Sequence, residues 1–230
     1  MTQFMSNSLF FGAAISLIAY EAGLLLKRKF KMAIFNPLLI AIIAVIAVLC
    51  LLHIDYDTYN QSGQYISYLL TPATVCLAVP LYQQMELLKK NLKAVVIGIV
   101  SGVLASLVSV LILARLFRLS HEQYVTLLPK SITTAIGMGV SEELGGIVTI
   151  TVAVIIITGI LGNVIADTVF HIFKIKNPLA KGLALGTASH AIGTARAIEM
   201  GPVEGAMSSL AVAVAGLLTV VFVSGFAQLI

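Results

Sequence analysis

A basic side chain stands within a polar run of an otherwise apolar stretch of the chain. Lys130 follows Pro129 and precedes the hydroxyl groups of Ser131, Thr133 and Thr134. One interpretation is a lysine near the end of a membrane segment, whose long side chain reaches the interface. The other is a cation that lines a pathway for an anion. The neighbouring hydroxyl groups favour this second interpretation, because they add hydrogen-bond donors beside the charge.

A second run, Gly186–Arg196, combines two glycines and three hydroxyl groups with a histidine and an arginine. Close helix packing explains the small residues but not His190 and Arg196 together. These two lie six positions apart, so a break at Gly193 would be needed to turn both toward one cavity. His190 could then relay a proton, and Arg196 could hold a carboxylate through two parallel hydrogen bonds. The further candidate ligands in this run are the hydroxyl groups of Ser189 and Thr194.

A third run contains Thr71, Pro72 and Thr74, with Pro80 further along the chain. Each proline removes a backbone donor and leaves a carbonyl without its helical partner. The run is compatible with two helix ends that flank a turn. It is also compatible with a discontinuous helix whose second half points its N-terminus at an anion. The similar run around Gly193 favours the discontinuous helix.

The acidic side chains carry less information. Asn163 and Asp167 lie four positions apart on one helix face, where they could pair with each other or with a cation. The other acidic residues near the polar runs are expected to be solvated loop charges: Glu142, Glu143, Glu199 and Glu204. The chain has no HExxH, no GxSxG and no phosphate- or dinucleotide-binding glycine motif. We therefore expect neither an enzyme nor a cofactor or metal site.

The composition indicates the kind of element that positions these residues. Of the 230 residues, 59% are hydrophobic and 10% are charged, and the mean hydropathy is +1.04. Soluble domains carry about 25% charged residues. The composition therefore excludes a soluble globular domain, a disordered chain and a nucleic-acid binder. We expect an all-α integral membrane protein, with residues 1–230 forming a single transmembrane domain in the lipid bilayer.

The chain contains about seven or eight apolar segments of a length that suits membrane helices. Their residue ranges are 6–26, 32–52, 65–82, 94–114, 124–140, 145–166, 179–197 and 205–230. The third, fifth and seventh are interrupted by Pro or Gly and carry the three polar runs. Irregular backbone at membrane depth is tolerated only inside protein or along a water-filled cavity. Such segments therefore indicate the binding site of a transporter.

Lysine clusters predict the orientation of the segments. They lie at residues 27–31, 89–93 and 174–181, and the positive-inside rule places all three in the cytoplasm. Four crossings then leave Ser120 outside, so the fifth segment must enter and leave on the outer side, as a re-entrant loop or two half-helices. Segments six to eight would run opposite to segments two to four. The pattern thus predicts an inverted repeat with a broken segment in the middle of each half.

The polar runs also carry a family resemblance. The runs Asn36–Leu39, Leu128–Ser131, Gly186–Arg196 and Glu204–Ala206 resemble the LrgB/CidB family, also called antiholin-like. The resemblance implies a membrane regulator of murein hydrolase export and autolysis that acts with a small holin-like protein of the LrgA/CidA type. Plastid relatives, in which both modules are fused, are glycolate/glycerate transporters. Some bacterial pairs are linked to the uptake or release of pyruvate.

Residues and resemblance together predict a secondary transporter of small carboxylates such as pyruvate, lactate or glycolate. We expect a multi-pass protein of the bacterial plasma membrane, linked to control of autolysis, with His190 as a proton relay. The alternative is an antiholin-like regulator that transports nothing. The expected partners are a small organic acid anion, an LrgA/CidA-type protein and a second copy of the chain, but no nucleic acid.

Overall fold

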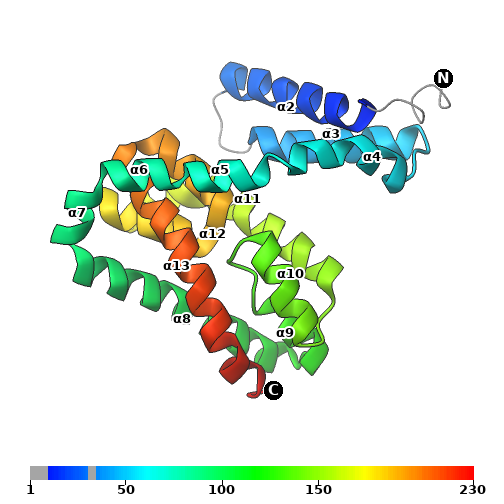
Figure 1. Cartoon of the computed structure of the whole chain (residues 1–230). Coiled ribbons are helices and arrows are strands. Elements are labelled where there is room, and N and C mark those ends of the chain that lie inside the picture. The colour runs from blue at the N-terminus through cyan, green and yellow to red at the C-terminus, as the bar shows by residue number, and fades with distance from the viewer. Residues whose placement is uncertain (1–9, 31–34) are drawn as a thin grey trace. The chain divides into compact units, whose positions relative to one another are not determined.

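Helices make up most of the described part of the chain. The computed structural model describes residues 10–30 and 35–230, apart from the side chains of Leu70, Thr71 and Thr74. Figure 1 shows these residues as helices, and no strand occurs among them. The chain divides into two compact units, Met1–Cys76 and Leu77–Ile230.

Within its described residues, the first unit contains four helices, with α2 packed against α3 and α4. The backbone N–H of Gly12 donates to Ser62 Oγ at 2.6 Å, which joins α2 to α4. Asn36 Oδ1 accepts from the first free N–H groups of α3, so this helix has a capped start. The bounds are α2 Phe11–Phe30, α3 Pro37–Leu51, α4 Tyr56–Ser67 and α5 Leu70–Cys76.

The second unit contains the three helices that are long and apolar enough to cross a membrane by length and composition. These are α8 (Leu92–Phe117), α11 (Val148–Ile172) and α13 (Pro202–Ala227). Among the described residues, α3 is a shorter apolar helix. The chain is therefore an all-α membrane protein. The remaining helices of this unit are α6 Ala78–Gln83, α7 Met85–Lys90, α9 His121–Leu127, α10 Thr134–Glu143 and α12 Pro178–Met200.

The core of the second unit lies between α8 and α13. Large apolar side chains of α8, such as Ile99 and Leu107, are fully buried in the same cluster as Met207 of α13. At their C-terminal ends, Arg115 donates to the carbonyl of Leu229 at 3.0 Å. The two helices therefore end side by side, as Figure 1 also shows.

The fifth predicted segment consists of two short helices, α9 and α10, separated by the non-helical residues 128–133. The N–H of Ile147, just after α10, donates to Thr126 Oγ1 in α9 at 2.8 Å. The segment that follows α10 therefore lies beside the C-terminal end of α9. Ser131, at the turn, bonds Ser106 near the middle of α8 at 3.0 Å. The pair is thus a broken hairpin whose turn reaches the middle of α8.

Helix α12 also contains a reversal. His190 has φ 42° and ψ −138°, which no helix accommodates. A Cβ on Gly193 would lie 2.6 Å from the carbonyl oxygen of Leu185. On a continuous helix these two residues would be about 12 Å apart. The chain therefore folds back at His190, and residues 191–200 lie against residues 178–189.

Contacts with α13 give the direction of both halves of α12. Gly182, near the start of α12, packs against Glu204, and Ile198, near its end, packs against Gly205. Both ends of α12 therefore lie beside the start of α13. This corrects one expectation, because the break lies at His190 rather than at Gly193. Gly193 instead provides the space in which the two halves meet.

Candidate functional site

A groove of about 750 Å³ lies within the second unit. It is bounded by α8, by the turn between α9 and α10, and by the first half of α12. Most of its lining side chains are small, and five of them carry hydroxyl groups: Ser101, Ser106, Ser109, Ser131 and Thr187. Among the described residues that line it, Lys130 is the only charged side chain.

The wall contributed by α8 follows from the spacing of its small residues. Ala94, Gly98, Gly102 and Ser106 recur every four positions and so share one face of the helix. The groove follows α8 from Asn91 to Ser109, which corresponds to about 27 Å of helix at 1.5 Å per residue. A Cβ on Gly102 would lie 2.8 Å from Thr187 Oγ1. Only glycine allows α12 to approach α8 this closely.

Lys130 is held at the level of the middle of α8. Its Nζ donates to Ser131 Oγ at 3.0 Å, and Ser106 Oγ donates to the same oxygen at 3.0 Å. No carboxylate of the described chain forms an ion pair with Lys130. The ammonium group therefore faces the groove with an uncompensated positive charge. Thr133 and Thr134, which begin α10, are not among the lining residues.

Two hairpins meet on one face of α8. Ser131, from the α9–α10 hairpin, contacts Ser106, and Thr187, from α12, contacts Gly102 one helical turn away. The α9–α10 hairpin enters from the C-terminal end of α8, whereas both ends of α12 lie at the start of α13. The turn of the α9–α10 hairpin thus lies beside the groove, where unpaired backbone groups can be solvated, and the α12 hairpin reaches the groove with its first half.

His190, Ser189 and Thr194 do not line this groove. His190 is buried, and its Nε2 lies 3.0 Å from the carbonyl oxygen of Ile155 in α11. Thr194 Oγ1 lies 2.8 Å from Ser208 Oγ in α13. Ser189 is packed against α11. In this arrangement the three side chains fasten the α12 hairpin to its neighbours.

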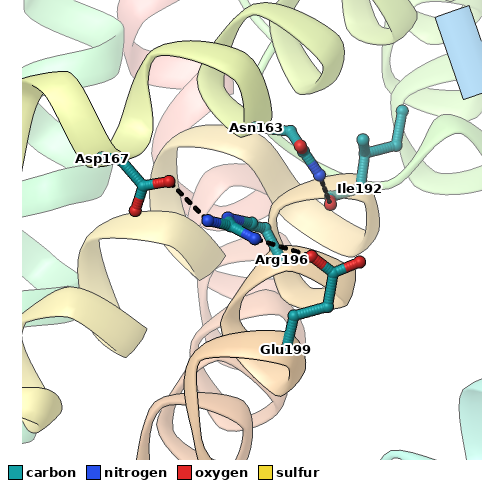
Figure 2. Close-up of polar contacts among 5 residues, drawn as sticks. All are labelled: Asn163, Asp167, Ile192, Arg196 and Glu199. Atoms are coloured by element: carbon teal, nitrogen blue, oxygen red, sulfur yellow. Dashed lines mark hydrogen bonds and ion pairs between the residues drawn. The ribbon is translucent and has the colours of Figure 1, made fainter. Parts of the chain in front are cut away.

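Arg196 lies in a separate ion-pair cluster, which Figure 2 shows. Its guanidinium binds Asp167 of α11 and donates to Glu199 Oε2 at 2.7 Å. Asn163 Nδ2 donates to the carbonyl of Ile192 at 3.0 Å, one turn away on α11. The expected pairing of Asp167 with a cation is therefore present. Two carboxylates already surround Arg196, so in this arrangement a third carboxylate is repelled.

The expectation that His190 and Arg196 face one cavity is therefore not met. His190 is buried against α11, whereas about a quarter of the Arg196 side chain is exposed (26%) among acidic groups. Of the third run, Pro72 is exposed in α5 of the first unit. The side chains of Thr71 and Thr74 lie outside the described residues.

Sequence reasoning missed the groove residues of α8 and α12. Ser101, Ser106 and Ser109 lie in a segment that looks like a plain membrane helix, because its hydropathy is high. The recurrence of small residues every four positions was the available signal. Thr187 was part of the second polar run but was not selected as a ligand.

Comparisons with known proteins agree with the resemblance seen in the sequence. The profile of the LrgB-like family matches residues 16–229. The chain is 41% identical over 218 residues to the antiholin-like protein LrgB of Bacillus mycoides (strain KBAB4), covering 94% of this chain and 95% of that protein. It is 40% identical, with the same coverage, to the proteins of that name from Bacillus cereus (strain B4264) and Bacillus anthracis (strain CDC 684 / NRRL 3495). No solved structure matches the chain.

Proposed function

The chain belongs to the LrgB-like family of antiholin-like membrane proteins, and from this premise we propose that it transports small carboxylates across the bacterial plasma membrane. One observation carries the proposal. Lys130 is the only charged side chain among the described residues that line the groove, and it lies at the level of the middle of α8. A lysine at that depth costs several kcal/mol, which a bound anion would offset.

The contents of the groove favour a small monocarboxylate. One ammonium group matches the single carboxylate of such an acid. Pyruvate, lactate and glycolate all have this chemistry. The groove volume of about 750 Å³ exceeds the size of such an acid. A closed binding pocket would match the size of its ligand more closely. The excess volume therefore favours a hydrated path through which the ligand passes.

We attribute alternating access to the two hairpins. Helix α8 followed by α9–α10, and α11 followed by α12, are two copies of one pattern: a long helix and then a broken hairpin. The copies run in opposite directions, which supports an inverted repeat. Its two members would be α8 to α10 and α11 to α12, whereas the lysine pattern predicted segments two to four and six to eight. Movement of one hairpin against α8 would open the groove on one side at a time.

Proton coupling is assigned to the α12 hairpin. His190 stands at its turn, two residues from Ala188, which lines the groove. His190 is our candidate for the proton relay, because histidine is the side chain whose unperturbed pKa lies nearest to physiological pH. A second copy of the chain and a small LrgA/CidA-type protein are the proposed partners.

The second candidate function is regulation of murein hydrolase export without transport. The printed name of the relatives, antiholin-like protein, favours it. A regulator of this kind has no need for an unpaired lysine beside a groove at mid-membrane depth.

Counterflow distinguishes the two candidates. Purified protein in liposomes loaded with unlabelled lactate, pyruvate or glycolate should accumulate the labelled acid in a saturable manner. Exchange by the chain alone identifies it as the carrier. Exchange only after the small partner is added identifies the complex as the carrier. Folded protein without exchange in either preparation contradicts the transport proposal and supports the regulatory one.

A further inference from the structure

The hydroxyl groups that line the groove differ in where their protons point. Three donate to a backbone carbonyl of their own helix at 2.7–2.9 Å: Ser101 to Gly98, Ser109 to Ser106 and Thr187 to Leu183. Their oxygens therefore present lone pairs to the groove. A carboxylate can only accept hydrogen bonds, so these three groups are poorly suited to bind one.

Ser131 is different. Its Oγ accepts one hydrogen bond from Ser106 Oγ and one from Lys130 Nζ, each at 3.0 Å. A hydroxyl group has two acceptor lone pairs and one proton. With both lone pairs occupied, Ser131 retains only its proton, and no acceptor for that proton is found in the described chain. Lys130 likewise keeps two N–H donors beyond the one that binds Ser131.

We propose that Ser106 is a positioning residue that makes Ser131 an obligate donor to the transported anion. Ser106 would thereby create, with Lys130, a corner of the groove that offers donors and no acceptor. Such a corner favours a carboxylate over its neutral amide, because the amide NH₂ group needs an acceptor. The proposal deepens the proposed transport function and depends on it.

The test compares alanine variants on one helix. Ser106→Ala frees one lone pair of Ser131, so KM for lactate counterflow should rise about three- to tenfold with little change in the maximal rate. Ser101→Ala and Ser109→Ala are matched controls, because each removes a lining hydroxyl whose proton is bound by its own helix. Their KM should stay within about twofold of the wild-type value. Ser106→Thr, which retains the hydroxyl group, should restore most of the affinity.

Competition with lactamide measures the preference for a carboxylate over its neutral amide. A merely structural role of Ser106 would leave this preference unchanged. In the wild-type protein lactate should inhibit counterflow far better than lactamide, and Ser106→Ala should reduce this preference. A transporting protein in which Ser106→Ala behaves like Ser101→Ala, in both KM and lactamide preference, overturns the inference and leaves the transport function intact. Absence of counterflow by the wild-type protein, with or without the small partner, overturns both.

Discussion

At the scale of single residues, the two basic groups of the polar runs have opposite surroundings. Lys130 donates to the hydroxyl oxygen of Ser131 and lines the groove, whereas Arg196 is paired with Asp167 and Glu199. A cation that binds an anionic ligand must not already be paired with carboxylates of the protein. We therefore assign ligand binding to Lys130, and we assign Arg196 to holding the returning half of α12 against α11.

The Arg196 assignment predicts the outcome of a charge exchange. Arg196→Asp alone places three carboxylates together and should lower the thermal stability of the protein in detergent. Adding Asp167→Arg restores opposite charges across the same helix pair, so the double variant should recover most of the lost stability. The size of this coupling should be about 0.5–1 kcal/mol, because both side chains are partly exposed.

Two results would contradict this role for Arg196. One is additive destabilisation, with the double variant no more stable than the sum of the single variants predicts. The other is normal stability of Arg196→Asp together with a complete loss of lactate binding. The second result would return Arg196 to the ligand site that the sequence suggested.

At the scale of elements, the α12 hairpin depends on glycine at the point where its halves meet. A Cβ on Gly193 would lie 2.6 Å from both the carbonyl oxygen of Leu185 and the Cβ of Ser189. Neither neighbour is the flexible end of a long side chain. The hairpin therefore has little freedom to accommodate a larger residue at this position.

Gly193→Val should consequently destabilise the protein by about 1–3 kcal/mol, the usual cost of overpacking. Gly225→Val is the matched control, since it lies within α13 and a Cβ there has no neighbour within 4 Å. Thermal unfolding of both variants in the same detergent measures the difference. Equal midpoints for Gly193→Val and the wild-type protein would show that the two halves do not pack in this way.

The positions of the breaks could be predicted only in part. The lysine pattern called for a fifth segment that does not cross as one helix, and this segment is indeed divided into α9 and α10. It was not sufficient for the α12 hairpin, where Gly193 suggested the break and His190 carries it. Glycine serves both conformational freedom and close packing, and only the contact with Leu185 shows which one applies. The Ser106–Ser131 contact joins positions 25 apart, which no local pattern reveals.

At the scale of the whole molecule, the second unit predicts which segment ends share a side of the membrane. Both ends of the α9–α10 hairpin should be outside and both ends of α12 should be inside. The native cysteines, Cys50 and Cys76, are exposed and would be replaced by serine in the background protein. Single cysteines then report the side of each end: Ser120→Cys, Glu143→Cys, Lys176→Cys and Met200→Cys.

A membrane-impermeant maleimide added to intact cells should label positions 120 and 143 only. Positions 176 and 200 should become labelled once the cells are permeabilised. Labelling of position 200 in intact cells, with position 176 still protected, would mean that the seventh segment crosses the membrane. The hairpin reversal at His190 and the proposed inverted repeat would then be wrong.

The central claim is that Lys130 binds the transported anion, and exchange of labelled lactate by Lys130→Met in liposomes tests it most directly. Lys93→Met is the matched control, since Lys93 is an exposed lysine at the start of α8. Loss of a hydrogen bond to a charged group lowers affinity by about ten- to a hundredfold. We therefore predict a rise in KM of that size for Lys130→Met and normal exchange for Lys93→Met. Wild-type exchange by correctly folded Lys130→Met would contradict the account.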